Sequence, residues 1–151
     1  MRVAFVRHGE RASVSLDPDL TSAGRRMSAE TGRWLEGQGF RPQLAVRTPT
    51  ARTEQTLEEI LGVLGPVPVE VRSDLPETRY DWDALVDPLA SALGEVGNVL
   101  LIGHHPTLHF LVDSYGPPPQ PVPRHHFAAG LILSRVRGVW RIEAAWGGRA
   151  G

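Results

Sequence analysis

Hydrophobic residues along the chain form short continuous runs that alternate with stripes of helical spacing. The continuous runs predict strands at residues 2–6, 43–47, 67–72, 98–102, 128–136 and 139–145. Between and after them, apolar side chains recur every three or four positions, which predicts helices over residues 20–35, 57–64, 82–93 and 108–115. Thr21 or Ser22 is a suitable N-cap for the first helix, and Gly37 and Gly39 lie near its end.

Strands and helices alternate through most of the chain, which is typical of an α/β domain with a mostly parallel sheet. Arg137 and Gly138 connect the last two predicted strands, so this pair should form an antiparallel hairpin. We therefore expect a three-layer α/β/α fold with a mostly parallel central sheet and a C-terminal hairpin. The length of 151 residues fits one domain covering 1–151.

Composition removes several classes of function. A formal net charge of −1 and 41% hydrophobic residues describe an ordinary globular protein, and predict neither a nucleic acid nor a membrane as partner. No apolar run reaches the ~18 residues of a membrane span. The opening segment meets Arg7 and His8 too soon for a secretory signal, so we expect a cytoplasmic protein. The chain has no cysteine, which excludes thiolate chemistry.

Charged side chains gather where the predicted strands end. The residues after the first strand are Arg7, His8, Gly9, Glu10 and Arg11, and those after the second include Thr48 and Arg52. Asp74, Glu77 and Arg79 follow the third strand, and Gly103, His104 and His105 follow the fourth. The carboxyl ends of parallel strands meet at one edge of a sheet, so these residues should converge there. Clustered guanidiniums beside helix N-termini predict a site for a phosphoryl group.

Phosphate binding alone does not account for His8. Neighbouring guanidiniums disfavour the imidazolium, so they should lower the pKa of His8. A neutral imidazole has a lone pair that can attack phosphorus. His104 could then donate to a phosphoryl oxygen, and a carboxylic acid such as Glu77 could protonate the leaving group.

The sequence Arg7-His8-Gly9-Glu10 resembles the signature of the histidine phosphatase superfamily, also called the phosphoglycerate mutase-like superfamily. Residues 20–24 (LTSAG) resemble its leucine-threonine-x-x-glycine helix start. Residues 48–56 (TPTARTEQT) resemble its serine-proline-x-x-arginine-x-x-x-threonine segment, and residues 99–104 (VLLIGH) the strand with its second histidine. All four motifs occur in the family's order.

This resemblance implies that His8 is the phosphorylated nucleophile and that Arg7, Arg52 and His104 complete the phosphate pocket. We also expect phosphate contacts from three of their neighbours, namely Gly9, Arg11 and His105. Glu77 falls where many members of the family place the proton donor, and Asp81 and Asp83 are rivals for that role. No cofactor is expected, because guanidiniums supply the positive charge.

The short chain most resembles the compact bacterial phosphohistidine phosphatases, which implies a phosphohistidine protein as substrate and a small phosphomonoester as second choice. A mutase-type phosphotransferase is an alternative, although a mutase must retain its substrate and the sequence predicts no lid. A phosphate-binding module without catalysis is another. It would bind phosphate but release none from an aryl phosphate.

A metal site is a further alternative. His105 and His109 are four residues apart on one helical face, and His125 and His126 could complete a cage. No acidic residue accompanies these histidines at a known ligand spacing, so we expect no metal and interpret all four as ordinary loop residues.

Overall fold

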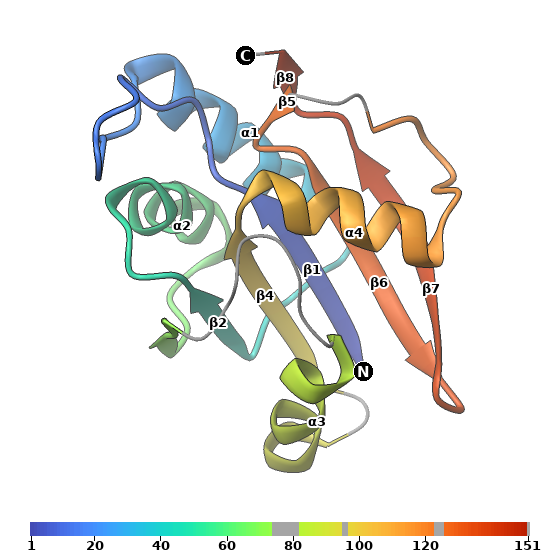
Figure 1. The fold of residues 1–151 in the computed structure, drawn as a ribbon. Helices are drawn as coiled ribbons and strands as arrows, with labels where there is room; N and C mark the ends of the chain where they lie inside the picture. The colour runs from blue at the N-terminus through green and yellow to red at the C-terminus, as the bar shows by residue number, and fades with distance from the viewer. Residues whose placement is uncertain (74–81, 95–96, 123–125, 151) are drawn as a thin grey trace.

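A six-stranded sheet forms the centre of the computed structural model, which describes residues 1–73, 82–94, 97–122 and 126–150 (Figure 1). The strand order is β3-β2-β4-β1-β6-β7. The strands are β1 (Arg2–Arg7), β2 (Leu44–Arg47), β3 (Val69–Val71), β4 (Asn98–Gly103), β6 (Gly130–Val136) and β7 (Val139–Trp146). The pairs β1–β4, β2–β4 and β2–β3 are parallel, whereas β6 runs antiparallel to both β1 and β7. The expected mostly parallel sheet with a C-terminal hairpin is confirmed.

Four helices accompany the sheet in the described part of the chain: α1 (Ser22–Gly37), α2 (Ala51–Leu64), α3 (Trp82–Leu93) and α4 (His105–Tyr115). Successive residues of β1 point to opposite faces, so they enter two separate cores. Val3 and Phe5 pack in one core with apolar residues of α3 and α4. Ala4 and Val6 pack in the other with residues of α1 and α2. This arrangement is the expected α/β/α layering. No helix of the described residues is both long and apolar enough to cross a bilayer.

Local signals set the element boundaries. Thr21 is the N-cap of α1, and its hydroxyl accepts a hydrogen bond from the Gly24 N–H. The hairpin turn places Arg137 and Gly138 at φ 52° and 76°, the left-handed pair that a type I′ turn requires. Pro106 lies in the first turn of α4, where a missing N–H has no cost.

Near the C-terminus the structure differs from the prediction. The predicted strand over 128–136 begins only at Gly130, because Ala128 has φ 57° and interrupts the extended backbone. Two further strands, β5 (His126–Phe127) and β8 (Arg149–Ala150), pair with each other in a separate small sheet. The interpretation of the histidines as loop residues is wrong for His105 and His109, which lie in α4, and for His126, which lies in β5.

Candidate active site

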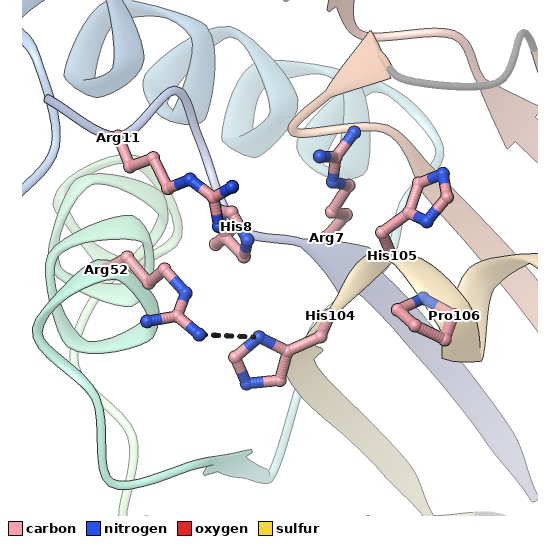
Figure 2. A pocket seen from close by; sticks show the side chains of 7 residues that line it. All are labelled: Arg7, His8, Arg11, Arg52, His104, His105 and Pro106. Atoms are coloured by element: carbon pink, nitrogen blue, oxygen red, sulfur yellow. Dashed lines mark hydrogen bonds between the residues drawn. The ribbon is translucent and has the colours of Figure 1, made fainter. Parts of the chain in front are cut away.

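A cavity of about 330 Å³ lies at the carboxyl ends of β1 and β4 (Figure 2). Its lining residues are Arg7, His8, Arg11, Arg52, His104, His105 and Pro106. They come from three places in the sequence: the end of β1, the first turn of α2, and the junction of β4 with α4. Parallel pairing places Arg7 directly opposite Gly103, so His8 and His104 emerge side by side from neighbouring strands.

The chain turns sharply after β1 because two glycines allow backbones to touch. A Cβ on Gly24 would lie 2.3 Å from the carbonyl oxygen of Glu10, and a Cβ on Gly9 would lie 2.6 Å from that of Gly24. Thr21 completes this contact: its hydroxyl donates to the Glu10 carboxylate at 2.8 Å, and its N–H donates to the Glu10 carbonyl. The leucine-threonine-x-x-glycine segment therefore fixes the course of the chain beside His8.

Gly9 itself does not line the cavity. We expected it to contact phosphate, but its N–H donates to the Thr56 hydroxyl at 2.9 Å. Thr56 in turn donates to the carbonyl of Arg52 at 2.7 Å. This pair of hydrogen bonds ties the turn after β1 to the first turn of α2, which carries the Arg52 side chain.

His8 is a buried, neutral imidazole that is only 3% exposed. Its pKa is lowered from 6.5 to about 3, mainly by burial. The hydrogen bond to the Gly9 carbonyl opposes this shift, and the charges of Arg7, His104 and Arg52 add to it. The predicted direction is confirmed, but burial has a larger effect than the guanidiniums that we had held responsible. The ring donates from Nδ1 to that carbonyl at 2.8 Å, so Nε2 keeps the lone pair.

His104 is oriented from both sides of its ring. Its Nε2 lies 2.9 Å from the Thr48 hydroxyl, and its Nδ1 lies 3.4 Å from a terminal guanidinium nitrogen of Arg52, as Figure 2 shows. Because Arg52 can only donate, Nδ1 accepts and Nε2–H donates to Thr48. The rings of His8 and His104 lie edge to face, with 5.6 Å between their centroids.

Arg7 is a buried cation whose charge no described carboxylate neutralises. It is 8% exposed, and its guanidinium lies 4.3 Å above the ring centroid of Phe127. Within the described residues, its Nε and Nη1 atoms are buried without a hydrogen-bond partner. Burial, and then the charge of Arg11, lower its pKa to about 10. Buried donors of this kind normally have a partner, so the site is suited to an anion.

Comparison with known proteins identifies the family to which this site belongs. The sequence profile of the histidine phosphatase superfamily (branch 1) matches residues 3–96. The phosphohistidine phosphatase SixA of Escherichia coli (strain K12) is 37% identical over 125 residues, which cover 78% of this chain and 75% of that protein. This chain belongs to the histidine phosphatase superfamily.

Structural comparison extends the likeness to almost the whole chain. The solved structure of the protein histidine phosphatase SixA in complex with tungstate superposes with a TM-score of 0.76 at 29% identity, and the match covers 96% of both chains. A 2,3-bisphosphoglycerate-dependent phosphoglycerate mutase of Nitrobacter hamburgensis is 38% identical over 90 residues, which cover 55% of this chain and only 44% of the mutase.

Of the three carboxylates considered as proton donor in this histidine phosphatase, Asp83 can be placed. Its carboxylate accepts hydrogen bonds from Arg135 at 3.1 Å and from the Trp140 indole at 2.8 Å. Arg135 pairs with the amino end of β1, at the edge of the sheet opposite the cavity. The structure therefore does not bring Asp83 to the site. Glu77 and Asp81 lie outside the described residues.

The remaining histidines have local partners. The Nε2 atoms of His105 and His109 are 2.8 Å apart, so one ring donates and the other accepts, and His105 also lines the cavity. His126 donates from Nδ1 to the Gly147 carbonyl at 2.7 Å. Across the described ranges, no group of three or more histidine or acidic side chains could hold a metal ion. His125 is not among the described residues.

Two kinds of residue at this site were missed by sequence reasoning. Thr48 and Thr56 lie inside a quoted motif, yet their hydrogen bonds to His104 and Gly9 were not foreseen. Only the bond from Thr56 to the Arg52 carbonyl had a local signal, because a threonine in a helix can bond to the carbonyl four residues earlier. Phe127, which contacts both Arg7 and His8, had no such signal, since β5 brings it to the site from a distant part of the chain.

Proposed function

We propose that this protein is a phosphatase that removes the phosphoryl group from phosphohistidine on a protein, through a phosphorylated His8. The observation that carries the proposal is a neutral, buried imidazole in a cavity lined by Arg7, Arg52 and His104. A protein phosphatase of the same family matches the chain over 96% of its length and binds tungstate, a tetrahedral oxyanion like phosphate. A cytoplasmic location stays a prediction.

The first step transfers the phosphoryl group to His8. Arg7 and Arg52 bind the phosphoryl oxygens and neutralise their charge, while Nε2 of His8 uses its lone pair to form a bond to phosphorus. The bond from phosphorus to the leaving group breaks at the same time. The leaving atom, a ring nitrogen in phosphohistidine, takes up one proton, for which Glu77 remains our predicted donor.

The second step returns the enzyme to its starting state. A water molecule attacks the phosphorus atom on His8, the bond from phosphorus to Nε2 breaks, and inorganic phosphate leaves. The residue that donated the proton in the first step, now deprotonated, takes one proton from the attacking water. The hydrogen bond from Nδ1 to the Gly9 carbonyl holds the ring in place throughout. It also stabilises the positive charge that the ring acquires while it carries the phosphoryl group.

The short match to the phosphoglycerate mutase favours hydrolysis over mutase-type transfer. The phosphoglycerate mutase match leaves more than half of that enzyme without a counterpart in this chain. A mutase must hold its substrate between two transfers, whereas a phosphatase needs to retain only the phosphoryl group. A small phosphomonoester remains the second substrate class, since it would use the same four residues.

The test compares wild type with His8→Asn on an aryl phosphate and on a histidine-phosphorylated protein. We expect wild type to release phosphate from both and to form an acid-labile phosphoenzyme. The His8→Asn variant, whose amide can replace the Nδ1 hydrogen bond, should bind phosphate but lose turnover by at least about 10³-fold. Activity near wild type in this variant would exclude His8 as nucleophile.

The same assay separates the alternatives. Phosphate binding without release from the aryl phosphate would identify a binding module. Net transfer between positions of a phosphoglycerate, with little free phosphate, would identify a mutase. Preference for a sugar phosphate over phosphohistidine would keep the chemistry and overturn the substrate.

A further inference from the structure

The loop between β1 and α1 exposes two aliphatic side chains to solvent. Val14 is 89% exposed and Leu16 is 102% exposed, the highest values of any large hydrophobic side chain in the described residues. Both lie within residues 12–19, which we call the β1–α1 loop. Neither side chain helps to hold the loop in place, since neither is buried against the rest of the protein.

Polar contacts fix the β1–α1 loop instead. Asp17 accepts a hydrogen bond from the N–H of Ala51, the first residue of α2, at 2.7 Å. Asp19 accepts from the Gln55 side chain at 2.7 Å, and its carbonyl accepts from the Ala12 N–H at the same distance. These bonds tie the end of the loop to α2, and the two ends of the loop to each other. Hydrogen bonds therefore hold the loop in place while Val14 and Leu16 remain exposed to solvent.

The β1–α1 loop adjoins the catalytic cavity. It begins directly after Arg11, which lines the cavity, and Asp17 contacts Ala51, which precedes the cavity residue Arg52. In Figure 1 the loop (blue) projects beyond α1 and α2. The loop therefore lies beside the start of α2, which carries the cavity residue Arg52.

We propose that the β1–α1 loop is a docking surface for the folded protein that carries the phosphohistidine, with Val14 and Leu16 packing on an apolar patch beside the modified residue. This inference rests on the proposed function. A histidine ring is separated from its backbone by a single methylene, so a phosphohistidine can reach His8 only if the surface around it comes down onto the rim of the cavity. A small phosphomonoester has no such surface and makes no contact there.

The positive charge of Arg11 beside the cavity complements the negative phosphoryl group of the same partner. Arg11 is exposed at the base of the loop, and it provides a positive group that attracts the phosphorylated side chain before the apolar contact forms. Two aliphatic side chains removed from water on docking strengthen binding without touching the reacting atoms. The docking surface should therefore act on KM for a protein substrate and leave the chemical step unchanged.

The test uses the double variant Val14→Ser/Leu16→Ser, with Val136→Ser/Val139→Ser as the matched control. Val136 and Val139 are 65% and 68% exposed and flank the hairpin turn at the opposite edge of the sheet. Three substrates are compared: an aryl phosphate, a short phosphohistidine peptide and a folded domain phosphorylated on one surface histidine. The thermal midpoint and oligomeric state of each protein are measured alongside.

We expect kcat/KM of the loop variant to fall roughly tenfold or more on the folded domain, through KM, and to stay unchanged on the aryl phosphate. The control variant should match wild type on all three substrates. Equal activity of wild type and loop variant on the folded domain would overturn the docking proposal alone. So would an equal loss on the aryl phosphate, or a wild-type dimer that the loop variant converts to monomers.

If the proposed function itself is wrong, the assays should give a different result. In that case wild type itself would hydrolyse the aryl phosphate but neither phosphohistidine substrate, and the docking proposal would be overturned together with the function on which it rests.

Discussion

Two arginines at opposite edges of the same sheet have opposite surroundings. Arg135 lies near the amino end of β1 and forms ion pairs with Asp83 at 3.1 Å and Asp87 at 2.5 Å. Arg7 lies at the carboxyl end of β1, where its pKa is lowered by burial and by the charge of Arg11. Both guanidiniums lie near an aromatic ring, Trp140 for Arg135 and Phe127 for Arg7. Only Arg135 has carboxylate partners among the described residues.

In the function that we propose, this difference distinguishes a cation that stabilises the fold, Arg135, from one that binds phosphate, Arg7. A cation with carboxylate partners helps the fold, whereas burying a charge without a counterion destabilises it. Such a charge persists where a ligand supplies the counterion. The lowered pKa of His8 at the same end of the sheet is consistent with this, because an environment that disfavours the imidazolium maintains the lone pair that our proposed mechanism requires.

Replacing each arginine by methionine should have the largest effects. Arg7→Met should reduce kcat/KM on an aryl phosphate by about 10²-fold or more, because a buried donor to the phosphoryl group is lost. Its free energy of unfolding should stay within about 1 kcal/mol of wild type or rise, since an uncompensated buried charge is removed. Enzyme assays and urea unfolding measure the two effects.

Arg135→Met should show the reverse pattern. Activity should be unchanged, while the free energy of unfolding should fall by about 1 kcal/mol, because Asp83 and Asp87 lose their partner on a partly exposed surface. Inorganic phosphate should raise the thermal midpoint of wild type and of Arg135→Met but much less that of Arg7→Met. Matching behaviour of the two variants would contradict the distinction between these edges.

A smaller loss of activity is expected when the positive charge of Arg52 is kept but the shape of its side chain is changed. In Arg52→Lys a single ammonium replaces the planar fork that can bind phosphate while it contacts His104. We expect kcat/KM to fall about 10- to 100-fold, in a steady-state assay. The control is Arg33→Lys on the exposed side of α1, which should match wild type. Equal kcat/KM for Arg52→Lys and wild type would show that a point charge is sufficient.

The sequence was informative wherever a signal was local. The Arg137-Gly138 turn was predicted correctly, and Thr21 was one of two predicted caps, because each depends on only a few consecutive residues. Because His8 and His104 each follow a predicted parallel strand, the sequence also predicted correctly that they lie close together. In contrast, β5 and β8 have two residues each and pair across more than twenty positions, so no periodicity could identify them.

Burial could not be predicted from neighbours in the sequence. The Arg7 and Arg11 that flank His8 drew attention to charge, yet the larger effect on its pKa is removal from water by the surrounding fold. Asp83 shows the converse error, since closeness in sequence to Glu77 suggested a shared site. The helix that carries Asp83 instead places it against Arg135.

The burial of His8 has a consequence for stability against acid. Its pKa is lowered from 6.5 to about 3 in the folded protein, so between these values the unfolded chain binds a proton that the folded chain does not. Stability therefore falls as pH falls through this window, by up to about 1.4 kcal/mol per pH unit. His8→Asn lacks this contribution, and its free energy of unfolding should decrease less between about pH 7 and about pH 4.5. Urea unfolding of both proteins at each pH measures the difference, and parallel curves would contradict the burial of a neutral His8.

A final prediction concerns the close backbone contact between Gly24 and Glu10, beside the cavity. Gly24→Ala should reduce the free energy of unfolding by about 1–3 kcal/mol, because the added methyl group meets the Glu10 carbonyl at 2.3 Å and one of the two backbones must move. Gly62→Ala in α2 is the matched control: nothing lies within 4 Å of its added Cβ, so the variant should gain about 0.5–1 kcal/mol from the better helix former. The Gly24 variant should also lose aryl phosphatase activity, since Glu10 lies two residues beyond His8 in the displaced turn. A destabilised Gly24→Ala that keeps full activity would show that His8 is held in place without the glycine contact.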